Sequence, residues 1–278
     1  MKLSYFDLHC DTLYEKYRDH NCKTQVDREK TDFEQYIQAY AIWSGHGDPP
    51  DTAYKRFTQI AESVRLPEGS FLAVEGAELL GHDLSRLETL KKYGVKYLTL
   101  TWQDENAVGG AWNTDAPLTE FGKELIKALP KYGIIPDLSH ASDRVFYGVA
   151  EMTDLFIATH SNSRAICNHG RNLTDGMFKI LRDNHSLVGV SLCPSHLREG
   201  GGADISDVMK HIEHYLSLGG EKTVCFGCDF DGTMPPPDLA GPHMMYKIAD
   251  FMASRGYGDA LIADIFFNNA NNYFNNKG

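Results

Sequence analysis

Residues that bind metal ions or transfer protons lie at the ends of several short apolar runs in this sequence. The first run, FDLHCDTLY, carries His9 and Asp11 two positions apart. Because side chains alternate between the two faces of a β-strand, these residues share one face, where they could hold a metal ion together. The alternative is structural: His9 would cap the end of the strand, and Asp11 would N-cap a following helix. Only distant partners can decide between the two interpretations.

Later apolar runs supply such partners: Glu75, His140, His160 and Asp229. Each could separately be a cap, a hydrogen-bonded core histidine or a member of an ion pair, but such residues should not gather at the same end of successive strands. Three histidines and three carboxylates exceed the ligands that one tetrahedral catalytic ion needs. The set therefore indicates two metal ions that share a bridging carboxylate, and Glu75 is the natural bridge.

The elements that must position these residues follow a repeated pattern of a strand and then a helix. Amphipathic segments, among them residues 83–93, 119–132, 142–153 and 205–218, lie between short apolar runs. This order predicts parallel strands with right-handed crossovers, closed as an α/β fold of the (β/α)8 TIM barrel type, with an open doubly wound sheet as the alternative. The eight predicted strands are YFDLHCD, AYAIWSG, FLAVEGA, YLTLTW, IIPDLSH, FIATHS, LVGVSLC and VCFGCDF.

Composition limits the classes of function. The 278 residues show no linker, which predicts one domain over residues 1–278. A net charge of -11 opposes non-specific binding to nucleic acid or to anionic lipid. Without a secretory or membrane-spanning apolar run, we expect a soluble cytoplasmic protein with reduced cysteines and no membrane partner. Long loops are predicted at residues 44–53, 103–117 and 232–242, after strand ends, where barrel enzymes build their sites.

Six sequence blocks, in order, carry a resemblance to a known family: FDLHCDT, FLAVEGA, YLTLT, IIPDLSHAS, FIATHSNSRAICNHGRNLTD and VCFGCDFDG. Together they resemble the membrane (renal) dipeptidase family of the amidohydrolase superfamily over nearly the whole chain. The resemblance implies a barrel hydrolase with two zinc ions per chain, a dipeptide as its small-molecule substrate and, by analogy, a homodimer. Manganese or cobalt would be tolerable on the same ligands.

The resemblance also implies individual roles. One zinc ion falls to His9, Asp11 and Glu75, and the other to Glu75, His140 and His160. Asp229 matches the catalytic acid/base, which takes a proton from a metal-bridging hydroxide and passes it to the leaving amine. Arg171 matches the arginine that holds the terminal carboxylate of the substrate, although a surface ion pair is the structural alternative.

Trp102 is where the chain departs from the family pattern. Better-known members read LTLTH at this point, with a histidine that contacts substrate, whereas this chain reads LTLTW. An indole offers one neutral N–H donor and a larger apolar face, so we expect a narrower, more apolar substrate pocket. The alternative is that Trp102 packs under the loop at residues 103–117.

Other motifs point away from further sites, and other functions remain open. His211 and His214 are expected on a solvated helix face, and Cys225 and Cys228 on opposite faces of a strand. A bridging carbamylated lysine, as in the phosphotriesterase-like branch, is disfavoured because Lys96 precedes its strand. The alternatives to a dipeptidase are an amidohydrolase for an N-acyl amino acid, cyclic amide or lactone, and a barrel that binds without turnover.

Overall fold

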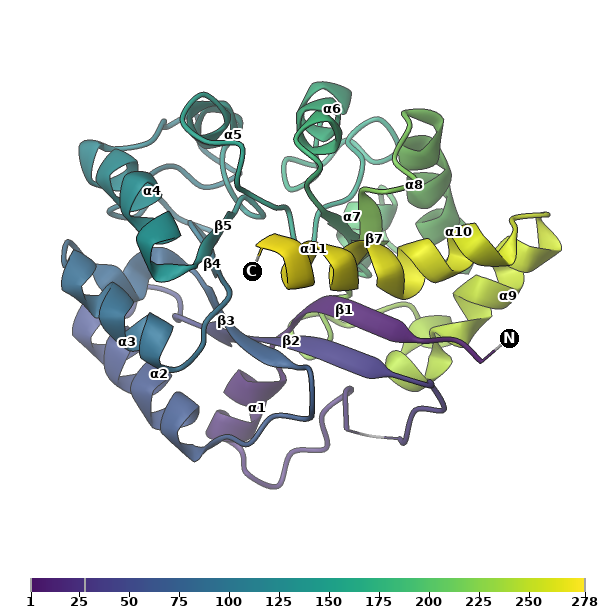
Figure 1. Ribbon diagram of the computed structural model, residues 1–278, viewed down its shortest axis with the longest axis horizontal. Coiled ribbons are helices and arrows are strands. Elements are labelled where there is room, and N and C mark those ends of the chain that lie inside the picture. Colours follow the sequence, from purple (N-terminus) through teal and green to yellow (C-terminus); the bar gives the residue numbers. More distant parts are fainter. Residues whose placement is uncertain (1, 28, 278) are drawn as a thin grey trace. The chain divides into compact units, whose positions relative to one another are not determined.

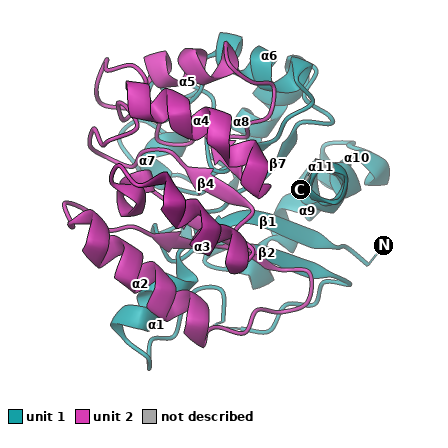
Figure 2. Cartoon of the chain, turned by 60° about the vertical axis from the view of Figure 1, so that its left-hand side comes forward, with its two compact units in different colours: residues 1–38, 159–277 teal, residues 39–158, 278 magenta. Residues whose placement is uncertain are grey.

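The computed structural model describes residues 2–27 and 29–277, in which helices alternate with parallel strands (Figure 1). The chain forms two compact units, which Figure 2 shows in different colours. Unit 1 comprises residues 1–38 and 159–277, and unit 2 comprises residues 39–158. Strand β2 (Tyr36–Trp43) begins in unit 1 and ends in unit 2. The single domain predicted for residues 1–278 stays a prediction.

Unit 1 is built on strands in the order β2, β1, β7, β6. Asp7 of β1 lies opposite Phe226 of β7, and both faces of β1 are buried, as a helix-covered parallel strand requires. Helix α11 contacts β1 and β7 (Figure 1), where Phe274 stacks on Phe6 with ring centroids 5.8 Å apart. The regular elements of unit 1 besides β2 are β1 (Tyr5–Cys10), α1 (Thr12–Arg18), α6 (Asp175–Asp183), β6 (Val188–Val190), α7 (Pro194–Leu197), α8 (Ile205–Ser217), β7 (Val224–Phe226), α9 (Tyr246–Ser254), α10 (Asp259–Ala263), a π-helical turn (Asp264–Asn268) and α11 (Asn269–Lys277).

Unit 2 has strands in the order β5, β4, β3, β2, with Trp43 of β2 opposite Glu75 of β3. The side chains of Thr119 and Ser142 accept backbone N–H groups and so cap its helices α4 and α5, which begin within one residue of the predicted segments. Its strands and helices besides β2 are α2 (Pro50–Ser63), β3 (Phe71–Glu75), the 3-10 helices Ala77–Leu80 and Leu84–Arg86, α3 (Leu87–Lys92), β4 (Tyr97–Thr99), α4 (Glu120–Tyr132), β5 (Ile135–Asp137) and α5 (Asp143–Ala150).

The sixth predicted strand, FIATHS, is the main departure from the predicted elements. Ile157 forms only an isolated parallel bridge with Asp137, and the chain turns at Thr159. A Cβ at Gly189 or Gly227 would overlap the Thr159 carbonyl oxygen, so two glycines make room for this turn. The turn ends the strand early and places His160 directly after it.

Two smaller predictions are wrong. The loop expected at residues 44–53 ends earlier, because α2 begins at Pro50, a residue whose fixed φ suits the first helical turn. His211 is buried rather than solvated: its Nδ1 accepts the backbone N–H of Ser163 at 3.0 Å, and its Nε2 donates to the Leu197 carbonyl at 2.9 Å. It is a hydrogen-bonded core histidine.

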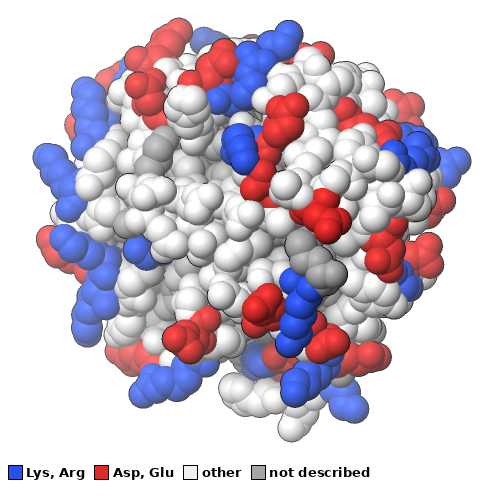
Figure 3. Space-filling view, turned by 45° about the vertical axis from the view of Figure 1, so that its right-hand side comes forward, with Lys and Arg blue, Asp and Glu red and all other residues white. Residues whose placement is uncertain are grey.

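Basic and acidic side chains are interspersed on the face that Figure 3 shows, so that face has no broad patch of one sign. Among the residues the structure describes, no helix is long and apolar enough to cross a membrane.

Candidate metal centre

The end of β1 in unit 1 carries the two residues that opened the sequence. His9 is fully buried, and its Nε2 lies 3.8 Å from Asp11 Oδ2. Asp11 occupies the N-cap position of α1, but its side chain makes no capping hydrogen bond. The buried Oδ1 of Asp11 accepts no hydrogen bond from any residue that the structure describes. The carboxylate therefore does not serve as a helix cap, which removes the structural alternative for Asp11.

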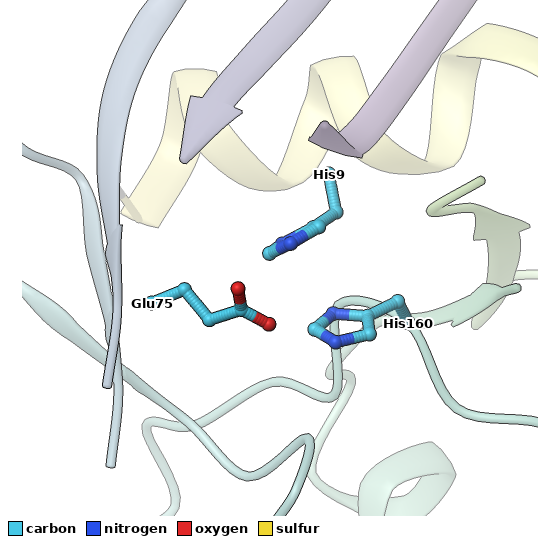
Figure 4. A group of neighbouring side chains, drawn as sticks. All are labelled: His9, Glu75 and His160. Carbon is cyan, nitrogen blue, oxygen red and sulfur yellow. The ribbon is translucent and has the colours of Figure 1, made fainter. Parts of the chain in front are cut away.

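His160, which the turn at Thr159 positions, lies beside His9. The two ring centroids are 3.9 Å apart, and Figure 4 shows the rings side by side. Nδ1 of His160 lies 2.8 Å from the Thr159 hydroxyl, so the ring has a hydrogen-bonding partner on one side. A ligand histidine is commonly oriented in this way, with its second nitrogen left for the metal ion.

Asp229 joins this cluster from the loop after β7. One ligand atom each of His9, Asp11 and Asp229 lie within 4.8 Å of one another. The backbone φ of Asp229 is 63°, a left-handed conformation that costs a non-glycine residue about 1–3 kcal/mol. Such strain persists only where the surrounding structure holds it, which is common at functional sites.

Burial and neighbouring charges set the pKa of Asp229. Burial of the carboxyl group, followed by repulsion from the Asp11 carboxylate, raises the pKa of Asp229 to about 7. His9 and Arg171 act in the opposite direction. A carboxyl group with a pKa near neutrality can both accept and donate a proton under working conditions, as a general acid/base must.

The cluster in unit 1 fits a metal ion. Ligand atoms about 2 Å from a shared zinc ion lie within about 4 Å of one another, close to the 3.8 Å between His9 Nε2 and Asp11 Oδ2. Imidazole nitrogen and carboxylate oxygen are ligands that zinc accepts, and the buried Oδ1 of Asp11 has a lone pair available for a cation. A cation would also relieve the repulsion between the two carboxylates.

Unit 2 holds the other predicted ligands. Glu75 is the last residue of β3 (Figure 4), and its Oε1 lies 2.9 Å from His140 Nε2. His140 has a φ of 68°, and its Nδ1 donates a hydrogen bond of 3.1 Å to the Trp102 carbonyl. With the proton on Nδ1, a neutral His140 ring presents the lone pair of Nε2 toward Glu75. Glu75 and His140 thus form a pair to which a metal ion could bind.

Trp102 lines a cavity of about 380 Å³ in unit 2. Its indole packs against Trp43, with ring centroids 4.6 Å apart, and its edge meets His46. The cavity is walled by the loops after β2, β3 and β4: residues 45–48, Pro50, Glu78, Gly81 and residues 102–107. Trp102 therefore faces open space besides packing against its neighbours, and its carbonyl orients a predicted ligand.

Arg171 is only 5% exposed in unit 1, which removes the surface ion pair as an explanation. Its backbone N–H donates to His169 Nδ1 at 3.1 Å. Burial, followed by the charge of Arg171, lowers the pKa of His196 to about 2, so that ring is neutral. A buried guanidinium among neutral rings is suited to bind an anion.

The structure divides the predicted site residues between the units. His9, Asp11, His160, Arg171 and Asp229 lie in unit 1; Glu75, Trp102 and His140 lie in unit 2. Two further residues were not predicted: Asp231, which accepts a hydrogen bond from Thr12 next to Asp11, and Gly232, where a Cβ would overlap the Asp11 and Asp229 carboxylates. Both residues belong to the GCDFDG block, which carries the family resemblance, but only Asp229 of that block was predicted as a site residue.

The chain is similar to known proteins. A family model described as membrane dipeptidase (peptidase family M19) matches residues 55–275. An uncharacterized protein in the pqqA 5' region of Klebsiella pneumoniae is 30% identical over 221 residues, which are 73% of this chain and 81% of that protein. Dipeptidase aclJ of Aspergillus oryzae is 30% identical over 177 residues, 60% of this chain but only 42% of that protein.

Among solved structures, the chain is similar to a metallo peptidase from Rhodobacter sphaeroides liganded with a phosphinate mimic of the dipeptide L-Ala-D-Ala. The TM-score is 0.91 at 22% sequence identity, with 100% of each chain covered. At this identity the likeness speaks for the fold alone. It confirms the predicted α/β fold class of the (β/α)8 barrel type.

We expect replacement of Asp229 by Asn to stabilise the metal-free protein at pH 8 and to have little effect near pH 4. The folded state holds the Asp229 proton with a pKa of about 7, against an ordinary value of 3.8. The bound proton contributes to the free energy of unfolding. This contribution is complete at a pH below the pKa of Asp229 in the unfolded chain, and it is lost as the pH rises through the pKa of Asp229 in the folded protein. Asparagine cannot ionise, so the variant escapes this loss. Thermal unfolding of chelator-treated protein across this range measures the difference.

Asp204 supplies a control of opposite sign. Hydrogen bonds from Ser206 lower the pKa of Asp204, so Asp204→Asn should lose stability at pH 8. If wild type and Asp229→Asn changed in parallel between pH 4 and pH 8, the raised pKa would be refuted.

Proposed function

Because the chain belongs to the membrane dipeptidase family (peptidase family M19), we propose that it hydrolyses the amide bond of short dipeptides with the help of two zinc ions. The observation that carries this proposal is that His9 and Asp11, which are both buried, lie within 4.8 Å of the Asp229 carboxylate. Two carboxylates and an imidazole within one ligand sphere are poorly explained by packing, and a raised pKa adds an acid/base group to the same cluster.

We assign the metal ligands as follows. His9, Asp11 and Glu75 would hold one zinc ion, and Glu75, His140 and His160 the other. The 3.8 Å between His9 Nε2 and Asp11 Oδ2 in unit 1 supports the first set, and the contact between Glu75 and His140 in unit 2 supports the second. When bound, the ions would polarise the scissile carbonyl group and lower the pKa of an attacking water molecule.

Asp229 would move the proton. It takes the proton of the attacking water on one carboxylate oxygen and delivers it to the leaving amine, so one group serves both steps. The position of Asp229 suits this double role, because its carboxylate lies within 4.8 Å of ligand atoms of His9 and Asp11.

Arg171 and Trp102 would select the substrate. The buried guanidinium of Arg171 binds the terminal carboxylate of the dipeptide, with the neutral ring of His196 close by. Trp102 offers an apolar wall and one N–H donor at the cavity of unit 2. A dipeptide mimic bound to the Rhodobacter sphaeroides metallo peptidase supports this class of substrate.

Glu75→Gln should lower the zinc content from two ions per chain to one or none, because an amide is a much weaker ligand than a shared carboxylate. Elemental analysis after dialysis measures this. Glu78→Gln is a matched control: Glu78 is three residues away in the same unit, and its Oε1 accepts a hydrogen bond from Asn106 at 3.0 Å. Two retained zinc ions in Glu75→Gln would refute the bridge.

Asp229→Asn should reduce kcat about 100-fold or more, in the range typical for removal of a general acid/base. Zinc content should stay near that of wild type, because the proposed ligands are untouched. Steady-state kinetics on a dipeptide, normalised to bound zinc, measure the effect. Turnover within a few-fold of wild type would exclude Asp229 from proton transfer.

Arg171→Ala should raise KM for dipeptides with a free C-terminal carboxylate about 10-fold or more and change amidated substrates little, because only the carboxylate offers a bidentate partner. Arg198→Ala on the surface of the same unit is the control. Equal losses on both substrate classes would contradict the role of Arg171.

If fully zinc-loaded wild type cleaved N-acyl amino acids, cyclic amides or lactones but no dipeptide, the amidohydrolase alternative would replace the leading function.

A further inference from the structure

The turn after Asp229 has two residues, Asp231 and Gly232, to which the proposed function gives no role. Asp229 and Asp231 both have left-handed backbones, with φ values of 63° and 68°. Two non-glycine residues in this conformation within three positions need strong local restraint. The contacts of Asp231 supply it.

Asp231 connects the turn to the segment that follows β1. Its carboxylate accepts hydrogen bonds from the Thr12 hydroxyl and from the backbone N–H of Gln25. In return, the Gln25 side chain accepts the Asp231 backbone N–H at 3.0 Å and donates to the Thr233 carbonyl at 3.0 Å. Because Thr12 directly follows Asp11, these bonds join the chain that carries Asp11 to the chain that carries Asp229.

Gly232 controls the space between the same two residues. A Cβ at this position would overlap Asp11 Oδ2 and Asp229 Oδ1. The backbone of Gly232 is not left-handed, so an alanine here is not excluded by its own conformation. An added methyl group would therefore displace the two carboxylates, whereas the turn itself does not demand glycine.

We propose that Asp231 and Gly232 are positioning residues that set the separation and direction of the Asp11 and Asp229 carboxylates. Asp231 holds the two chain segments together, and Gly232 leaves the space in which the carboxylates face each other. The inference rests on the proposed function, in which Asp11 binds zinc and Asp229 transfers the proton. A displaced Asp229 would still bind substrate but would transfer its proton poorly, so kcat should fall more than KM rises.

The test compares zinc-loaded Gly232→Ala, Asp231→Ala and Asp231→Asn with wild type. We expect kcat to fall about 100-fold in Gly232→Ala and at least 10-fold in Asp231→Ala, with KM within about 3-fold of wild type. Asp231→Asn keeps one acceptor oxygen and should lie between wild type and Asp231→Ala. Zinc affinity, measured by competition with a chelator, should fall about 10-fold in Gly232→Ala, because the added methyl group displaces Asp11.

Two controls separate positioning from simple stability. Gly258→Ala adds a methyl group in the same unit where no atom lies within 4 Å of the new Cβ. Asp204→Ala removes a carboxylate that accepts two backbone N–H groups at the start of α8. Both should keep the kcat and zinc affinity of wild type, although Asp204→Ala should lower the melting temperature.

The outcomes are distinguishable from failure of the proposed function. Wild-type kcat in fully zinc-loaded Gly232→Ala and Asp231→Ala would overturn the inference, whatever their melting temperatures. If wild type bound zinc but hydrolysed no dipeptide, the proposed function would fail, and zinc affinity would decide the inference. A lower zinc affinity in Gly232→Ala but not in Gly258→Ala would then support the positioning role, and equal zinc affinities in the two variants would overturn it. If Gly232→Ala did not fold, the same comparison would be made between Asp231→Ala and Asp204→Ala.

Discussion

The close approach of two carboxylates, Asp11 and Asp229, beside the buried ring of His9 is the constraint on which the centre in unit 1 depends. Two like charges about 4 Å apart repel by roughly 4 kcal/mol at an effective dielectric constant of about 20. The fold tolerates this in the metal-free state by protonation, which the raised pKa of Asp229 reflects. A bound cation would replace the proton and convert the repulsion into attraction.

In unit 2, a backbone carbonyl group orients the side chain of His140. The Trp102 carbonyl accepts the Nδ1 proton of His140 and so directs Nε2 toward Glu75. Because the acceptor belongs to the main chain, the orientation of His140 does not depend on which side chain stands at position 102. The change from the histidine of better-known family members to an indole can therefore alter substrate recognition while the proposed ligand geometry is kept.

Much of the fold was predictable because strands and helices have distinct periods. The starts of α4, α5 and α8 were predicted to within one residue, and each helix follows a capping Thr, Ser or Asp. The strand expected in FIATHS failed because its end depends on a carbonyl that packs against Gly189 and Gly227, which are distant in sequence. His211 was misplaced for a similar reason, since its buried partners, Ser163 and Leu197, come from other segments.

The sequence by itself determined the order of strands and helices and the residue types at the strand ends, because hydrophobic periodicity and side-chain chemistry are local properties. They predicted His9 and Asp11 as possible metal ligands, and the family resemblance added Asp229 as the proton carrier. Only the tertiary structure decided that Asp11 does not cap its helix, that Arg171 is buried, and that Asp231 and Gly232 hold Asp11 and Asp229 together. The last of these facts depends on contacts between segments more than 200 positions apart, such as those of Asp231 with Thr12 and Gln25, and no local pattern in a single sequence records such contacts.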